Sequence, residues 1–219
     1  MRWRFLLCIA AAAPVLLTAC AASTSTMTRF DLGLPPTGAA PEPHLANAHT
    51  LAEVYAPARL DSPAIVYRLA YDDANQVRAY AQSQWVAAPA SLLSQRLRER
   101  LSLALSAGIA RADETPASDY LLRVELEEFS QVFDTPTRSH AVLQACATLI
   151  DLRRHELVAQ RVFEVQRPAP SPNALGAAHG LRDAGDQFIT ELLHWMDQPR
   201  PERVVLTRND PFGYGAACP

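Results

Sequence analysis

The sequence predicts an α+β fold, in which a mostly antiparallel sheet is covered by two amphipathic helices. Two long segments repeat apolar residues every three or four positions, which is typical of helices that bury one side. Several other segments alternate apolar and polar residues, which is typical of strands with one face in water. Turn residues and prolines separate these segments and mark where each element stops.

Four strands are predicted before the first helix, and a loop rich in proline and alanine, residues 34–48, lies between the first two. The last two form a hairpin around Asp72–Asn75, because polar residues separate two runs of strand character there. The four strands are residues 28–33, 50–56, 64–69 and 76–82.

The first helix begins at Pro89, because proline is well tolerated in the first turn, and it ends near Gly108. Its leucines recur every four residues and define one buried stripe: Leu93, Leu97, Leu101 and Leu105. Its charged residues occupy the other faces: Arg96, Arg98, Glu99 and Arg100.

Three more strands follow, and residues 153–156 turn the chain between the last two. In the first of them Leu122, Val124 and Leu126 point to one side, and Glu128 would share that side unless the strand bends. The three strands are residues 119–129, 139–152 and 157–166.

The last helix covers roughly residues 173–197, and Pro199 ends it. Its apolar side chains keep spacings of three and four: Leu181, Ala184, Phe188, Leu192 and Trp195 or Met196. Its polar side chains lie opposite: Arg182, Asp183, Asp186, Gln187 and Glu191.

The amino terminus has the order of an export signal, with two arginines before the apolar run 5–17. A membrane-spanning helix needs about 20 apolar residues, so this run is too short to be one. It ends in Leu17-Thr18-Ala19-Cys20, which resembles the bacterial lipobox, whose cysteine is acylated after cleavage. We therefore divide the chain into a signal peptide, a lipidated tether, a domain and a flexible tail: residues 1–19, 20–27, 28–198 and 199–219.

The anchor at Cys20 has one alternative, and the residues after Cys20 bear on which membrane holds it. A cysteine can also end an ordinary cleaved signal by coincidence, and the combined pattern disfavours that interpretation. Ala21 and Ala22 follow Cys20, and neither is the aspartate that often retains such lipoproteins at the inner membrane. We therefore expect a lipid-anchored protein on the periplasmic face of the outer membrane.

Composition excludes several functions. The formal net charge is −3, which does not favour nucleic acid as a partner. All twenty basic residues are arginine, so a Walker A loop and Schiff-base chemistry, which both need lysine, are excluded. The six histidines have no metal-ligand spacing, and no nucleophile elbow occurs. We expect no cofactor, no metal and no catalytic residues.

Three other residues are candidate sites. Cys146 and Cys218 remain after the signal and the lipid site are set aside. They could form a disulfide, but we favour a buried free thiol at Cys146, because Cys218 lies in a tail rich in glycine and proline. Trp85 lies after a strand and before a proline, where it is either a core residue, which we favour, or a contact for lipid or a partner.

The order of several segments resembles the ABC-type transport auxiliary lipoprotein family. After the lipobox come the segments Phe30–Gly33, 78–93, 119–133, 155–170 and 188–196. The resemblance spans most of residues 28–198, and Phe30 stands where the family often has tyrosine.

The resemblance implies a non-enzymatic subunit of an MCE-type lipid transport system. Such a subunit would dock, or form a conduit with, a periplasmic MCE-domain protein, and the ABC ATPase and the permease would be separate chains. It also leaves self-association into a ring open. The alternative is an envelope assembly or structural lipoprotein unconnected to lipid transport. A lipoprotein hydrolase is a third and weaker candidate, because no nucleophile–base set is present.

Overall fold

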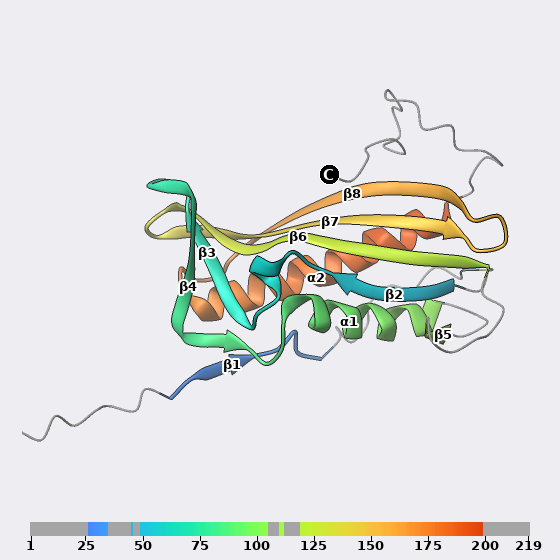
Figure 1. Cartoon of the computed structure of the whole chain (residues 1–219). Helices are drawn as coiled ribbons and strands as arrows, with labels where there is room; N and C mark the ends of the chain where they lie inside the picture. Colours follow the sequence, from blue (N-terminus) through green and yellow to red (C-terminus); the bar gives the residue numbers. More distant parts are fainter. Residues whose placement is uncertain (1–25, 35–44, 46–48, 105–109, 112–118, 199–219) are drawn as a thin grey trace, which may run out of the picture.

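The described residues form one sheet and two α-helices, as the sequence predicts, together with a short 3₁₀ helix (Figure 1). The computed structural model describes residues 26–34, 45, 49–104, 110–111 and 119–198. The strands are β1 (Thr28–Phe30), β2 (His49–Tyr55), β3 (Ala64–Leu69), β4 (Asp73–Trp85), β5 (Ala110–Arg111), β6 (Tyr120–Thr135), β7 (Arg138–Asp151) and β8 (Glu156–Pro168). The helices are α1 (Pro89–Ala104), α2 (Ala174–Asp197) and the short 3₁₀ helix η1 (Ala58–Leu60).

The long strand β6 lies at the centre of the sheet. Along one edge it pairs antiparallel with β7, which pairs antiparallel with β8. Its other edge is shared by two strands, because β2 pairs parallel with its first half and β3 pairs parallel with residues 130–133. β3 continues antiparallel to β4, and β1 runs parallel to the end of β4. The longest pairs are antiparallel, as predicted, and the parallel pairs make the sheet mixed.

Both helices cover the same face of the sheet. α2 packs on β7, β8 and β6, and α1 packs on β2 and on α2 (Figure 1). The stripes predicted for α1 and α2 are confirmed within the described residues, since Leu93, Leu97 and Leu101 are each 1% exposed. No helix of the described residues covers the opposite side of β6, β7 and β8, and we call that side the helix-free face.

A β-bulge in β6 decides which residues face the helices. Leu126 pairs with Ala145 and Glu128 pairs with Gln144, so Glu127 is the extra residue. Before the bulge the even-numbered residues are buried, and after it Phe129 and Phe133 take their place. The strand therefore bends where the sequence left that question open, and Glu128 lies on the helix-free face.

Aromatic side chains fill the core between α2 and the sheet. The ring of Phe163 contacts those of Phe188 and Trp195, with centroids 5.4 Å and 5.9 Å away. Each such buried side chain contributes about 1.5–3 kcal/mol to stability. Trp85 belongs to the same core, because it is 0% exposed and its ring lies 5.7 Å from that of Phe129. Its indole does not reach the surface, so a lipid or partner contact at Trp85 does not fit this conformation.

The start of α2 is fixed by a cap and by close packing. The side chain of Asn173 accepts a hydrogen bond from the Gly176 N–H at 3.0 Å. A Cβ at Gly176 would lie 1.9 Å from the Ser171 carbonyl oxygen, so only glycine fits there. The helix thereby begins directly beside the loop that leaves β8.

Candidate functional sites: the anchor junction and a surface pocket

The loop that follows β1 joins the predicted tether to the helical layer, and we call it the anchor junction, residues 31–34. The Asp31 carboxylate accepts a hydrogen bond from the Gly33 N–H at 2.7 Å. Gly33 has φ of +66°, in the left-handed region that favours glycine. Leu32 is buried in the core at 5% exposure. The segment Phe30–Gly33, which carries part of the family resemblance, thus forms a strand end, a turn and a core contact.

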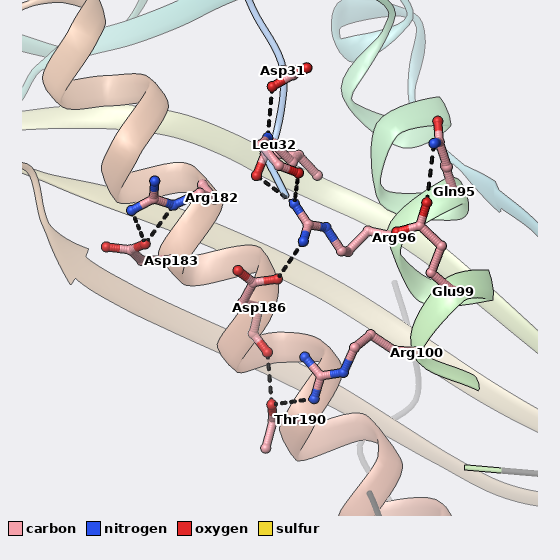
Figure 2. Close-up of polar contacts among 11 residues, drawn as sticks. Asp31, Leu32, Gln95, Arg96, Glu99, Arg100, Arg182, Asp183, Asp186 and Thr190 are labelled. Carbon is pink, nitrogen blue, oxygen red and sulfur yellow. Dashed lines mark hydrogen bonds and ion pairs between the residues drawn. The ribbon is translucent and has the colours of Figure 1, made fainter. Parts of the chain in front are cut away.

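Arg96 of α1 holds this loop from inside the protein (Figure 2). Its Nη2 donates to the carbonyl oxygens of Leu32 and of Gly33, the second at 2.6 Å. Its Nη1 lies 3.7 Å from the Asp186 carboxylate on α2. One guanidinium therefore ties together the anchor junction and both helices.

The burial of Arg96 and Arg100 corrects the sequence prediction. Both were expected on the polar faces of α1, and they are only 3% and 5% exposed. The polar sides of the two helices face each other and the anchor junction, so charged groups on both sides are enclosed. The sequence pattern of one helix does not predict this contact between α1 and α2.

Asp186 is the acidic partner in this cluster. Burial raises the pKa of its carboxyl above the ordinary value, although the neighbouring guanidinium groups of Arg96, Arg100 and Arg182 oppose the rise in pKa. Arg100 donates to the Thr190 hydroxyl at 3.1 Å, and that hydroxyl donates to the Asp186 carbonyl oxygen at 2.9 Å (Figure 2). These bonds hold backbone and side chains in place, which suits a structural clamp.

A pocket of about 540 Å³ opens on the other side of the sheet, beside the β6 bulge. The end of β2 and η1 form one wall, and β6 and β7 form the other. Its lining residues are Tyr55, Ala56, Pro57, Arg59, Glu125, Leu126, Glu127, Glu128 and Gln144.

Charges in the pocket are only partly balanced. The Glu128 carboxylate accepts from Arg68 Nη2 at 2.8 Å and lies 3.9 Å from Arg59 Nη2, which also donates to the Glu127 carbonyl oxygen. Within the described ranges, neither Glu125 nor Glu127 has a salt-bridge partner for its carboxylate. The pocket therefore offers two half-buried acidic side chains without a matching cation.

Several other kinds of site are not found in the described part of the chain. No group of three His, Cys, Asp or Glu side chains there is placed to hold a metal ion. Neither described helix combines the length and apolar character needed to cross a membrane.

The predicted cysteine sites fall differently. Cys20 and Cys218 lie outside the described residues. Cys146 lies in β7 and is 1% exposed, so its predicted burial is confirmed, but it forms a disulfide and is not the free thiol favoured from the sequence. The sequence analysis did not predict the role of Arg96 in joining α1 to the anchor junction. The only sign of that role in the sequence is its place one turn after Leu93 of the leucine stripe.

Comparison with solved structures supports the fold. The crystal structure of protein XCC0632 from Xanthomonas campestris, of family DUF330, is 23% identical with a TM-score of 0.65; the match covers 78% of this chain and 93% of that chain. An uncharacterised protein is 16% identical with a TM-score of 0.58, over 78% of this chain and 99% of that chain. At these identities the likeness concerns the fold alone. No curated protein matches the chain significantly.

The family model supplies the assignment. The model described as "ABC-type transport auxiliary lipoprotein component" matches residues 30–192, from the end of β1 to the last turns of α2. That range covers most of the chain and nearly all of the described sheet and helices. The chain therefore belongs to the family of ABC-type transport auxiliary lipoprotein components.

Proposed function

We propose that this chain is anchored in the outer membrane by acyl chains on Cys20 and docks a periplasmic MCE-domain protein that carries lipid. The observation that carries the proposal is the family match over residues 30–192, which begins ten residues after the lipobox cysteine, Cys20. The ABC ATPase and the permease are separate chains, since a chain without lysine has no Walker A loop. The role is docking or conduit rather than catalysis, because the family is a transport component.

The anchor junction supports an anchored role. Thr28 lies eight residues after Cys20, and an extended chain of that length spans at most about 26–29 Å. Two or three acyl chains at Cys20 give durable attachment, because each buried CH₂ adds about 0.8 kcal/mol. Beyond Thr28 the chain enters the sheet and is held by Arg96, so the domain remains close to the bilayer.

The helix-free face supports a docking role. Both helices cover the other face, so this surface of β6, β7 and β8 is the broad part of the described sheet without a helical layer. The pocket lies on it, with Glu125 and Glu127 half-buried at its wall. Acidic groups of this kind favour a partner surface that carries basic side chains.

Anchoring is tested with two cysteine variants. Cys20→Ala should abolish labelling by radioactive palmitate and release the domain from membranes, because the acceptor sulfur is gone. Cys8→Ala, inside the apolar run of the signal, should leave both unchanged and serves as the control. Wild-type protein that is unlabelled and free in the periplasm would contradict the proposed anchor.

Docking is tested by affinity purification from detergent-solubilised membranes. We expect an MCE-domain protein to be recovered with the wild-type chain. Glu127→Arg in the pocket should reduce its recovery at least tenfold, whereas Glu99→Arg on the exposed side of α1 should not. Recovery of unrelated envelope proteins only, with unchanged detergent sensitivity after gene deletion, would support an assembly or structural lipoprotein instead.

A further inference from the structure

The burial of Cys146 is unusual for its position on the sheet. Its neighbours along β7, Ala145 and Ala147, face the helices and are 0% exposed. Because strand side chains alternate, Cys146 points to the helix-free face. Gln144 and Thr148 share that face and are half-exposed, yet Cys146 is 1% exposed and forms a disulfide. A segment of chain therefore covers the helix-free face at this sulfur.

We propose that this segment is the carboxyl end of the chain, residues 199–219, fixed to the helix-free face by a disulfide between Cys218 and Cys146. The chain has four cysteines, and the other two are Cys8 and Cys20. Cys8 is removed with the signal peptide, and the Cys20 sulfur carries the diacylglyceryl group in the proposed function. Cys218 is then the thiol that remains for Cys146.

The length and character of residues 199–219 fit this role. Cys218 lies 21 residues after Asp197, the end of α2, and such a segment reaches at most about 70 Å. It carries apolar side chains that suit a half-buried sheet surface: Val204, Val205, Leu206, Phe212 and Tyr214. On the helix-free face, the residue of β8 that pairs with Cys146 is Val162, whose apolar side chain is half-buried.

The disulfide brings the chain end to the pocket. Cys146 pairs with Glu125 of β6, and Gln144 lies two residues before Cys146 on the same face. Glu125 and Gln144 both line the pocket. The Cα atoms of a disulfide are about 4.4–6.8 Å apart, so Cys218 lies beside that wall. The proposed disulfide therefore lies on the same pair of strands, β6 and β7, that forms this wall of the pocket.

The bond forms by thiol–disulfide exchange in the oxidising periplasm. The Cys146 and Cys218 thiols lose two protons and two electrons and form one S–S bond. The oxidant is the disulfide of a periplasmic dithiol oxidoreductase, which is reduced to its dithiol. The step therefore depends on export but not on an MCE partner.

The test uses the mature lipoprotein, extracted from membranes in detergent with free thiols alkylated, and digested with trypsin without reductant. Trypsin cuts this chain only after arginine, so Cys146 lies in peptide 139–153 and Cys218 in peptide 209–219. We expect one mass for the two peptides joined, which separates on reduction. On a non-reducing gel the protein should run as a monomer, which shows that the bond is within one chain.

Three results would overturn the proposal. The first is an alkylated Cys146 in the unreduced sample. The second is a disulfide-linked dimer. The third is peptide 139–153 joined to peptide 20–29, which would also remove the acyl acceptor at Cys20 and so refute the proposed anchor. The first two leave the anchor untouched, so the two proposals fail separately.

A second measurement keeps the proposal testable in folded protein. Brief trypsin treatment should nick the wild type after Arg208, yet peptide 209–219 should stay attached until reductant is added. In Cys218→Ser the peptide should leave without reductant, and the thermal midpoint should fall by roughly 5–15 °C. Release of the peptide from unreduced wild type would contradict the proposal.

Discussion

At the scale of single residues, two buried polar side chains join parts of the chain that are far apart in sequence. Arg96 holds the anchor junction and α2, as described above. Gln131 is 0% exposed and accepts a hydrogen bond from the Tyr80 hydroxyl at 2.6 Å. Its amide nitrogen donates to Ser139 Oγ at 2.8 Å and to the Ser171 carbonyl oxygen at 3.3 Å. Such satisfied buried groups are costly to disturb, because an unpaired partner stays in the core.

The first prediction concerns Arg96. Arg96→Met removes the donors to Leu32 and Gly33 and the guanidinium that lies 3.7 Å from the Asp186 carboxylate. We expect the free energy of unfolding to fall by about 3 kcal/mol, as when one partner of a buried ion pair is lost. Arg98→Met, on the same helix and half-exposed, should change it by less than about 0.5 kcal/mol. Urea denaturation measures both, and equal losses would contradict the clamp.

The second prediction concerns Tyr80 and alkaline pH. Burial, with a smaller contribution from Tyr67, raises the pKa of Tyr80 from 10.0 to about 12. A raised pKa means that the fold favours the neutral phenol, so this contribution to stability is complete below pH 10 and is lost as the pH rises through 12. Tyr80→Phe should remove that part of the alkaline decline.

The measurement is urea denaturation of both proteins from pH 7 to pH 11.5, with tyrosinate absorbance recorded in parallel. At pH 7 the variant should be less stable by about 1–3 kcal/mol, because the Gln131 carbonyl oxygen loses its donor. The gap should narrow as the pH rises above 10. A constant gap across the range would show that Tyr80 titrates normally.

At the scale of elements, the sequence predicts most helices and strands because their faces differ in polarity. It does not predict that β2 and β3 pair parallel with β6, because alternation defines a buried face and not a neighbour. The bulge at Glu127 had a signal in the sequence, because two residues separate the apolar positions Leu126 and Phe129, whereas strict alternation would place one residue between them. The burial of Arg96 does not follow from the pattern of α1 alone, because it depends on α2, which lies 78 or more residues later in the chain.

The third prediction concerns the start of α2. Gly176→Ala places a Cβ 1.9 Å from the Ser171 carbonyl oxygen, which is backbone and cannot move aside alone. We expect a loss of about 1–3 kcal/mol or more in the free energy of unfolding. Gly185→Ala is the matched control, because its Cβ meets only the end of the Leu93 side chain, at 3.2 Å.

The control should be nearly neutral, since alanine favours a helix over glycine by about 1 kcal/mol and offsets a small adjustment of Leu93. Thermal unfolding followed by circular dichroism ranks the two variants. If Gly185→Ala were the more damaging change, the close approach of α2 to the loop after β8 would be wrong.

At the scale of the whole molecule, β1, which follows the proposed tether in sequence, and the turn between β7 and β8 lie far apart. Figure 1 shows β1 and that turn at opposite ends of the protein. The sequence predicts the tether before β1 and the turn between β7 and β8. It also leaves Cys146 and Cys218 as the cysteines outside the signal and the lipid site. It did not place Cys146 next to the pocket, because that requires the register of β6 against β7.

The fourth prediction concerns orientation on the membrane. The chain has no lysine, so an amine-reactive dye labels one introduced lysine once the amino terminus is acylated. Thr28→Lys should place a dye within about 30 Å of the bilayer surface, because eight residues connect it to Cys20. A membrane-surface quencher in proteoliposomes should therefore reduce its fluorescence strongly, and that of a dye at Glu156→Lys less.

Lengthening the tether is the control for that experiment. Eight additional glycine and serine residues after Ala22 should reduce the quenching at position 28, because the flexible connection becomes longer. Equal quenching at positions 28 and 156 would show that the domain lies flat on the bilayer rather than standing on β1.

The parallel pairing of β1 with β4 has a mechanical consequence. A pull that enters at Thr28 along the strand loads all the backbone bonds between β1 and β4 at once, in shear, instead of opening them one after another. Directly after β1, the hydrogen bonds from Arg96 to the carbonyl oxygens of Leu32 and Gly33 resist further extension of the chain. Tension between a bilayer and a large assembly would therefore be carried by the core of the domain. Only the short tether before β1 would extend under that tension.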